Sequence, residues 1–258
     1  LFAIAEAIRE LRTNIQFMDV DNPPRIIVVS SPLPGDGKST TASNLAITLA
    51  SSGQKVFLID GDLRRPMIGN IFKLVEGAGL TDVLAGRADI MDVAQPVGGS
   101  GNLLVVGAGK IPPNPSEVLG SFRMRDLMRT LAKDATIIID APPLIPVTDA
   151  AVLANSADGA IIVATVGKST YEVLNKALSI LTRAGARPLG IVLNRVPRRG
   201  AGAAYYGYQY QGEYYRRDEA EGTVEPEVEH EVVNATRPPE SNRTAPPSRR
   251  AARRTENP

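Results

Sequence analysis

Short runs of β-branched and other apolar residues, separated by helical patterns, constrain this sequence more than any other feature. In the apolar runs, apolar and polar residues do not alternate, which is typical of strands covered on both faces in a parallel sheet. The runs span residues 25–31, 56–60, 103–107, 136–140, 160–166 and 189–194, and helical periodicity covers residues 38–51, 117–132 and 170–184. We therefore predict an α/β domain with a central, mostly parallel β-sheet flanked by helices and right-handed crossovers.

The composition changes near residue 200, which divides the 258-residue chain into three parts. We predict a folded domain over residues 1–200 and a tyrosine cluster over residues 201–215. Residues 216–258 are rich in Glu, Arg, Pro, Asn and Thr and have no sustained apolar period. Such a segment buries too little apolar surface to offset its ordering entropy, so we predict a disordered tail.

Charge and composition exclude several classes of function. Lys and Arg total 29 and Asp and Glu total 28, a balance that argues against nucleic acid as the main partner. Cysteine is absent, which excludes disulfides and thiolate chemistry. His230 is the single histidine, and it lies in a charged, Pro-containing stretch near the end where no rigid site is expected, which excludes Ser-His-Asp triads and multi-histidine metal sites. No run reaches the roughly 18 apolar residues of a membrane span, so we expect this sequence to be soluble. It begins at Leu1, and we expect a fragment of a longer protein.

The strongest local motif lies between the first predicted strand and the helix that follows it. Gly35 and Gly37 allow backbone N–H groups to turn inward around an anion, and Lys38 and Ser39 supply an ammonium group and a Mg²⁺ ligand. The motif departs from the usual phosphate loop in one place, because Pro32 occupies the position of its first glycine. The alternative is an ordinary glycine-rich turn. We predict that ATP binds at Pro34, Gly35, Asp36, Gly37, Lys38, Ser39 and Thr40.

Carboxylates follow two of the predicted strands. Asp60 and Asp62 are two residues apart at the end of one strand, so both side chains can point into the same crevice, although a solvated charged turn would give the same pattern. Asp140 ends another strand, where a carboxylate that holds Mg²⁺ is expected. Three acids and one lysine around an anion site indicate Mg-ATP chemistry.

Together these motifs resemble the bacterial tyrosine kinases of capsule and exopolysaccharide export, which have a P-loop NTPase fold. Residues 31–39 match the family's phosphate loop, in which a non-glycine residue is tolerated at Pro32. Asp60, Asp62 and Arg64 match its second motif, and Asp140 with the prolines that follow it matches the third. Residues 112–121 are similar to the family's segment before the next helix. The resemblance extends from about Glu6 to Tyr215.

The resemblance implies roles for the two ends of the domain. It implies that Glu6, Arg9 and Arg12 mediate contacts between subunits, although helical spacing alone would favour an intrahelical surface pair. It also implies that a tyrosine cluster is phosphorylated in trans on neighbouring subunits. The alternative for that cluster is a low-complexity linker. The cluster comprises Tyr205, Tyr206, Tyr208, Tyr210, Tyr214 and Tyr215.

The resemblance further implies how the site works. Asn194 corresponds to a residue that reads the adenine edge, although many such residues only cap turns. A phenol needs a proton acceptor at neutral pH, and with His230 excluded from a rigid site the base must be a carboxylate. We assign this role to Asp60 and place Ser39, Asp62 and Asp140 around Mg²⁺, although Asp60 and Asp62 can be exchanged. Lys38, the loop amides and Arg64 would neutralise the transferred phosphoryl group.

The family also implies partners and a location. Its members form homo-oligomers with a transmembrane activator domain, either fused upstream or separate, at the cytoplasmic face of the membrane. The main alternative is a switch ATPase of the chromosome-partition or division-site type. Those proteins carry a second lysine where this sequence has Leu33, and they lack the tyrosine cluster. A scaffold without catalysis is the third alternative, and all three carboxylates argue against it.

Overall fold

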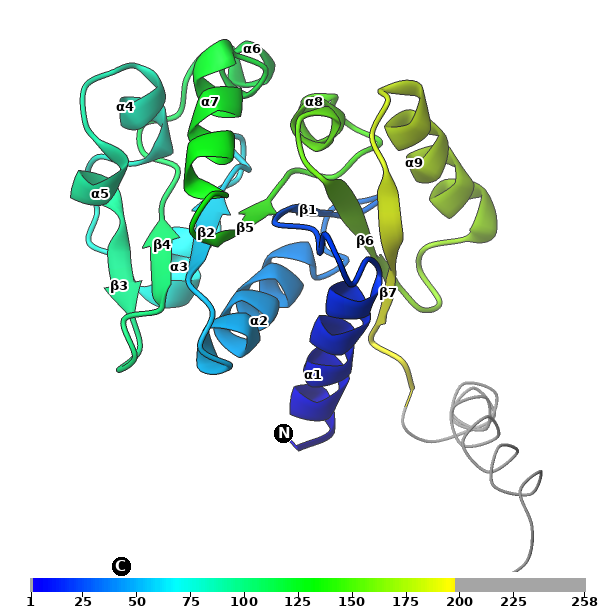
Figure 1. The fold of residues 1–258 in the computed structure, drawn as a ribbon. Coiled ribbons are helices and arrows are strands. Elements are labelled where there is room, and N and C mark those ends of the chain that lie inside the picture. The colour runs from blue at the N-terminus through cyan, green and yellow to red at the C-terminus, as the bar shows by residue number, and fades with distance from the viewer. Residues whose placement is uncertain (1, 198–258) are drawn as a thin grey trace, which may run out of the picture. The chain divides into compact units, whose positions relative to one another are not determined.

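A seven-stranded sheet forms the centre of the domain in the computed structural model, which describes residues 2–197 (Figure 1). The strand order is β3-β4-β2-β5-β1-β6-β7, and all neighbours are parallel except β3 and β4. The mostly parallel sheet predicted from the sequence is confirmed. The strands are β1 (Ile26–Ser30), β2 (Val56–Asp60), β3 (Gln95–Val97), β4 (Leu103–Val106), β5 (Thr136–Asp140), β6 (Gly159–Thr165) and β7 (Pro188–Asn194).

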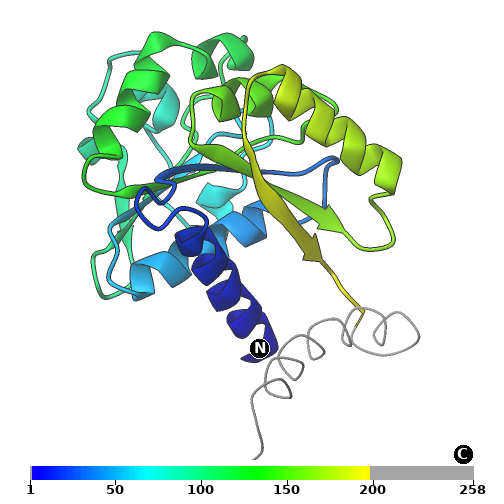
Figure 2. The ribbon, with the colours of Figure 1, turned by 45° about the vertical axis from the view of Figure 1, so that its right-hand side comes forward.

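Helices cover both faces of this sheet (Figures 1 and 2). Buried side chains of α1, α2 and α3 belong to the core on one face, and those of α4 to α9 belong to the core on the other. The helices are α1 (Phe2–Phe17), α2 (Lys38–Ser51), α3 (Ile68–Phe72), α4 (Leu80–Leu84), α5 (Ile90–Val93), α6 (Pro115–Leu119), α7 (Phe122–Leu131), α8 (Asp149–Asn155) and α9 (Tyr171–Arg183).

Strand β1 shows why the apolar runs lack alternation. Ile26 and Val28 pack into the core on the α4–α9 side, whereas Ile27 and Val29 pack into the core on the α1–α3 side. Because successive side chains of a strand point to opposite faces, both sets are buried only when helices cover both faces. Burying each such side chain contributes roughly 1.5–3 kcal/mol, so the central strands anchor the domain.

The structure corrects one prediction of secondary structure and adds one strand. The single helix predicted over residues 117–132 is wrong, because Gly120 ends α6 and Ser121 starts α7 as its N-cap. The Ser121 hydroxyl accepts a hydrogen bond from the Met124 N–H at 3.2 Å. Strand β3 was not predicted, and its Pro96 lies on the antiparallel edge of the sheet, where a missing N–H is tolerated.

The position of β5 determines where the site forms. Strand β5 lies between β1 and β2, and its register pairs Asp140 with Asp60 of β2 and with Val29 of β1. The carboxyl ends of these three strands therefore meet at one edge of the sheet. The phosphate loop, which follows β1, lies at the same edge.

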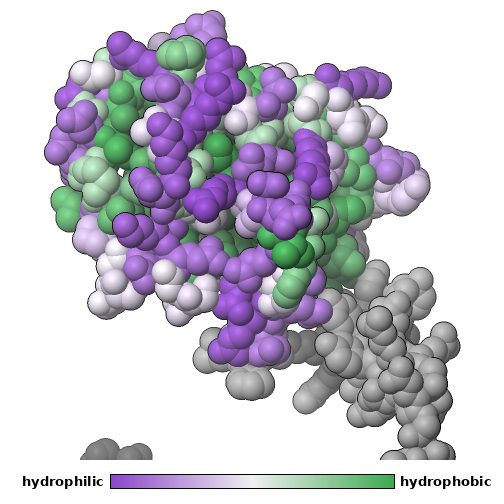
Figure 3. All heavy atoms as spheres, in the orientation of Figure 1, coloured by the Kyte–Doolittle hydropathy of each residue, from purple (hydrophilic) through white to green (hydrophobic). Residues whose placement is uncertain are grey.

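Hydrophilic side chains cover much of the face seen in Figure 3, with apolar patches between them. Across residues 2–197 we find no helix with both the length and the apolar character needed to cross a bilayer. The predicted tyrosine cluster and the predicted disordered tail lie outside the described residues.

Candidate active site

The loop between β1 and α2 has the backbone conformation of a phosphate cradle. Gly35 and Gly37 have φ values of 80° and 97°, in the left-handed region that glycine adopts without a steric penalty. Gly37 is also the N-cap of α2, so the loop leads directly into the amino end of a helix. Consecutive residues in this arrangement direct their N–H groups toward one point, where an anion binds.

The hydrogen bonds of the loop agree with this role. Within residues 2–197, the backbone N–H groups of residues 35–40 donate to no protein acceptor, and the first helical bond runs from Thr41 N to Gly37 O at 2.9 Å. The first turn of any helix leaves N–H groups without intrahelical partners, but here the set extends back into the loop. These donors are available to phosphate oxygens.

The predicted lysine and acids converge around one point. The Lys38 ammonium lies 2.9 Å from Asp62 Oδ2, 3.3 Å from Asp140 Oδ1 and 3.3 Å from the Ser39 hydroxyl. Asp60 and Asp140 are fully buried, and Asp62 is almost so. Because the three acids come from β2, the segment after it and β5, only the folded sheet brings them together.

Burial changes the proton affinities of these groups. Burial lowers the pKa of Lys38, but the charges of Asp140 and Asp62 outweigh it, so the net shift is upward and Lys38 stays charged. Burial, together with the charge of Asp140, raises the pKa of Asp60 to about 7. Burial also raises the pKa of Asp140, although Lys38 opposes the shift. A carboxyl group with a pKa near neutrality is suited to accept a proton at neutral pH.

Asp60 is held firmly by the backbone that follows β2. Its Oδ2 accepts hydrogen bonds from the N–H groups of Met67 and Ile68 at 3.0 and 2.9 Å, and its Oδ1 accepts one from Asp62 at 3.3 Å. These bonds fix the carboxylate where the chain turns toward α3.

The residues present fit a magnesium ion and a nucleotide. Ser39, Asp62 and Asp140 offer oxygen ligands around a point of positive charge, and Asp140 Oδ2 is buried with no hydrogen-bond partner in the described part of the chain. Over residues 2–197, no group of three His, Cys, Asp or Glu side chains has the geometry to hold a metal alone. Mg²⁺ does not require such a group, because nucleotide enzymes bind it through one or two carboxylates, substrate phosphates and water.

Arg64 does not point at the phosphate loop in this structure but binds Asp149, a residue that the sequence analysis missed. The guanidinium donates from Nε to Asp149 Oδ2 at 2.8 Å and from Nη2 to Oδ1 at 3.1 Å, and Ser116 also donates to this carboxylate. Burial of Asp149 raises its pKa, but the bonds from Arg64 and Ser116 outweigh this, and the pKa falls below its usual range. Asp149 follows β5 by nine residues without a recognisable motif, so only the fold reveals it.

Asn194, at the end of β7, lies against the phosphate loop. Its Nδ2 donates to the Asp36 carbonyl at 2.9 Å, and its Oδ1 accepts from Arg195 N at 2.9 Å. The Asp36 side chain turns away from this bond and forms an ion pair at 3.2 Å with Lys168, a second residue that the sequence analysis missed. Among the residues that the structure describes, the side-chain amide of Asn194 still has one free N–H and one free lone pair.

The residues predicted to mediate self-association lie on α1. Glu6 and Arg9 form an exposed intrahelical ion pair at 2.7 Å, and Arg12 is partly buried on the same helix. Their role between subunits stays a prediction. The six predicted acceptor tyrosines, Tyr205 to Tyr215, lie outside the described residues.

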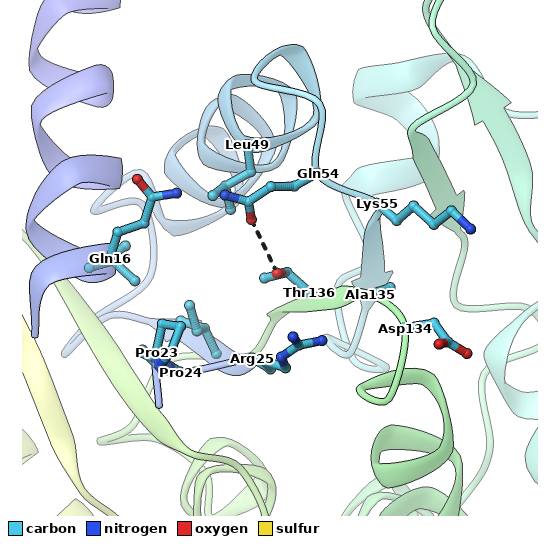
Figure 4. Close-up of a pocket in the computed structure, with 12 residues that line it drawn as sticks. Gln16, Pro23, Pro24, Arg25, Leu49, Gln54, Lys55, Asp134, Ala135 and Thr136 are labelled. Atoms are coloured by element: carbon cyan, nitrogen blue, oxygen red, sulfur yellow. Dashed lines mark hydrogen bonds between the residues drawn. The ribbon is translucent and has the colours of Figure 1, made fainter. Parts of the chain in front are cut away.

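A separate cavity of about 320 Å³ opens at the opposite edge of the sheet (Figure 4). It lies near the starts of β1, β2 and β5, and Arg25, Lys55 and Asp134 are among the residues that line it. The Thr136 hydroxyl donates a hydrogen bond to Gln54 Oε1 at 3.4 Å beside it. The phosphate loop, Asp60 and Asp140 lie at the other ends of these strands. This cavity is therefore not part of the candidate active site.

Comparisons with known proteins agree with the geometry. A model of the ParA family, described as NUBPL iron-transfer P-loop NTPase, matches residues 22–200. Tyrosine-protein kinase YwqD of Bacillus subtilis is 40% identical over 191 residues, which cover 74% of this chain and 80% of YwqD. Tyrosine-protein kinase etk of Escherichia coli K12 is 37% identical over 78% of this chain, which spans only 28% of that protein.

Solved structures separate the two leading alternatives. The kinase domain of Escherichia coli ETK matches with a TM-score of 0.73 at 36% identity, covering 76% of this chain and 77% of that one. MinD of Pyrococcus horikoshii, a septum site-determining protein solved with Mg-ADP, matches less well, with a TM-score of 0.55 at 26% identity over 68% of this chain and 72% of MinD. The alternative of a switch ATPase is therefore not favoured. The identities, the coverage and the shared P-loop sheet together establish that this chain belongs to the bacterial tyrosine kinases.

Proposed function

We propose that this chain is an ATP- and Mg²⁺-dependent protein-tyrosine autokinase. It phosphorylates its own tyrosine cluster, residues 205–215, in trans, and it regulates capsular or exopolysaccharide synthesis and export. The link to polysaccharide rests on the family resemblance. The proposal includes self-association through Glu6, Arg9 and Arg12 and activation by a transmembrane domain, fused upstream or separate, at the cytoplasmic face of the membrane.

One observation carries the proposal. A single ammonium group, Lys38 Nζ, lies within 3.3 Å of Asp62, Asp140 and Ser39, and the loop before it presents unpaired N–H groups. An anion cradle beside a set of oxygen ligands suits a metal-bound nucleotide triphosphate. A purely structural role for these groups would provide no acceptor for the N–H groups of the loop.

The residues have distinct roles in the transfer. Ser39, Asp62 and Asp140 would hold Mg²⁺, which offsets the charge of the phosphate oxygens. Lys38 leaves Asp62 and Asp140 and binds the β- and γ-phosphates, and the backbone N–H groups of residues 35–40 bind the same phosphate oxygens. The free N–H and free lone pair of Asn194 match the N7 and N6 groups of adenine.

The acceptor phenol attacks the γ-phosphorus and displaces ADP. The phenolic proton passes to Asp60, whose pKa of about 7 suits this role. Asp62 is the alternative base. Arg64 is committed to Asp149 in this structure and must leave it to reach the phosphoryl group, so its contribution requires a rearrangement of that ion pair.

The decisive experiment incubates the purified chain with labelled ATP and Mg²⁺ and measures both phosphotyrosine and ATP loss. We expect label confined mainly to Tyr205–Tyr215 and absent in Lys38→Met. Transfer in trans is tested by mixing Lys38→Met with a size-tagged variant in which all six tyrosines are phenylalanine. Label must then appear on the Lys38→Met chain, and its rate must rise with protein concentration.

Each alternative predicts a different result. ATP loss without phosphotyrosine would favour a switch ATPase, and neither activity would favour a scaffold. If the wild type is labelled but the Lys38→Met chain in the mixture is not, transfer in trans is contradicted. The kinase activity itself would then still stand.

A further inference from the structure

A buried carboxylate within the phosphate loop requires an explanation. Asp36 is fully buried, and its Oδ2 accepts hydrogen bonds from Leu33 N at 3.2 Å and from the Ser169 hydroxyl at 3.3 Å. A loop that binds a triphosphate gains affinity from positive charge, and a bare carboxylate inside it would repel the ligand. The charge of Asp36 must therefore be balanced within the fold.

The balancing charge comes from the segment between β6 and α9. Lys168 Nζ lies 3.2 Å from Asp36 Oδ1 and donates to the Pro34 carbonyl at 2.6 Å. It also lies over Gly35, where an added Cβ would be 3.5 Å from Nζ. One ammonium group thus contacts the phosphate loop on both sides of Gly35, at Pro34 and at Asp36.

The Lys168 segment is itself held in place from β6. The N–H groups of Lys168 and Ser169 both donate to the Thr165 carbonyl, at 3.1 and 3.0 Å, which forms a tight turn after β6. The Thr165 hydroxyl donates to the Asp36 carbonyl at 3.3 Å. The turn therefore binds the loop through the side chains of Thr165, Lys168 and Ser169, and the Lys168 side chain reaches Pro34 and Asp36.

We propose that Lys168 is a positioning residue of the nucleotide site, which neutralises Asp36 and fixes the Pro34–Asp36 backbone so that its N–H groups point toward phosphate. The inference rests on the proposed function, because it assumes that ATP binds this loop. Lys168 acts through Asp36 and the loop backbone, not on the reacting atoms. Its loss is therefore expected to weaken nucleotide binding more than it slows the chemical step.

The test measures the Kd of a fluorescent ATP analogue with Mg²⁺ and the KM and kcat of autophosphorylation. We expect Lys168→Met to raise Kd and KM about tenfold, equivalent to about 1.4 kcal/mol, with kcat changed less than about threefold. Lys168→Arg keeps the charge and is expected to stay within about threefold of the wild type. The matched control is Lys176→Met, which removes an exposed lysine from α9 and is expected to leave Kd unchanged.

A double-mutant cycle with Asp36→Asn tests the electrostatic argument. Without the Asp36 charge, Lys168→Met is expected to change Kd less than about threefold. This pair contains no unpaired buried carboxylate, so it remains informative even if Lys168→Met alone fails to fold. A tenfold loss in both backgrounds would overturn the inference, because Lys168 would then act independently of Asp36.

The wild-type measurement separates this inference from the proposed function. If the wild type does not bind the analogue, the nucleotide site itself is refuted, and the inference with it. If the wild type binds and Lys168→Met binds equally well, only the role of Lys168 is refuted.

Discussion

Replacing Gly37 by alanine tests the geometry of the phosphate loop most directly. A Cβ at this position would lie 2.1 Å from Asn194 Nδ2, and the backbone φ of 97° is unfavourable for any residue with a side chain. Asn194 must therefore move and lose its 2.9 Å bond to the Asp36 carbonyl. The left-handed backbone costs about 1–2 kcal/mol. The lost hydrogen bond costs about 0.5–1.5 kcal/mol more.

The expected result is a loss of about 1.5–3.5 kcal/mol in the free energy of unfolding, measured by urea denaturation. Gly53→Ala is the matched control, because Gly53 has a φ of 91° but nothing within 4 Å of an added Cβ. It is expected to cost about 1–2 kcal/mol from the backbone alone. Gly37→Ala is also expected to abolish binding of the ATP analogue, whereas Gly53→Ala leaves it unchanged.

The contribution of Asn194 is isolated by a second comparison. In an Asn194→Ala background the clash is absent, so Gly37→Ala should cost no more than Gly53→Ala. Equal costs of the two glycine substitutions in the wild-type background would refute the argument, because the contact between Gly37 and Asn194 would then carry no energy.

Three further predictions concern Asp60, Arg64 and Ser121. Because the pKa of Asp60 is raised to about 7 in the folded state, the folded protein holds a proton that the unfolded chain releases near pH 4, and stability is lost as pH rises from about 4 to 7. The unfolding free energy of Asp60→Asn minus that of the wild type, measured by urea denaturation, should therefore rise from pH 4 to pH 7 by at most about 4 kcal/mol. A difference that does not change with pH would contradict the raised pKa of Asp60. Arg64→Lys should lower the unfolding free energy by about 1 kcal/mol, because buried Asp149 loses a two-point contact. The control Arg65→Lys should change the unfolding free energy by less than about 0.5 kcal/mol. Equal effects of the two substitutions would contradict a stabilising role for the Arg64–Asp149 contact. Ser121→Ala should cost about 1 kcal/mol by removing the N-cap of α7, and a cost near zero would show that the cap is not needed.

The central elements were predictable because their signals are local. The runs that became β2 and β5 were predicted with the same bounds as in the structure, and the helix that follows the phosphate loop was predicted to start at Lys38, as it does. Gly35, Gly37 and Lys38 occur in a spacing that is typical of a phosphate loop, so the sequence alone is enough to recognise it. Burial of both faces of β1 follows from its uninterrupted apolar residues.

Other elements were missed because their signals are weak or tertiary. Strand β3 has three residues, one of which is Pro96, so no periodicity marks it. The break between α6 and α7 depends on Ser121, whose capping role competes with an otherwise helical pattern. Asp149 and Lys168 carry no motif at all, and their importance appears only when the fold sets them against Arg64 and Asp36.

The sequence by itself determined which residue types the site contains and that each follows a strand, because strand burial and loop chemistry are properties of neighbouring residues. It also determined the α/β class, because apolar runs covered on both faces require helices on both sides. Only the tertiary structure decided that β5 lies between β1 and β2, which makes Asp60 and Asp140 neighbours and lets Lys38 reach Asp62 and Asp140 together. Strand order depends on how helices pack between distant segments, and no local pattern encodes that packing.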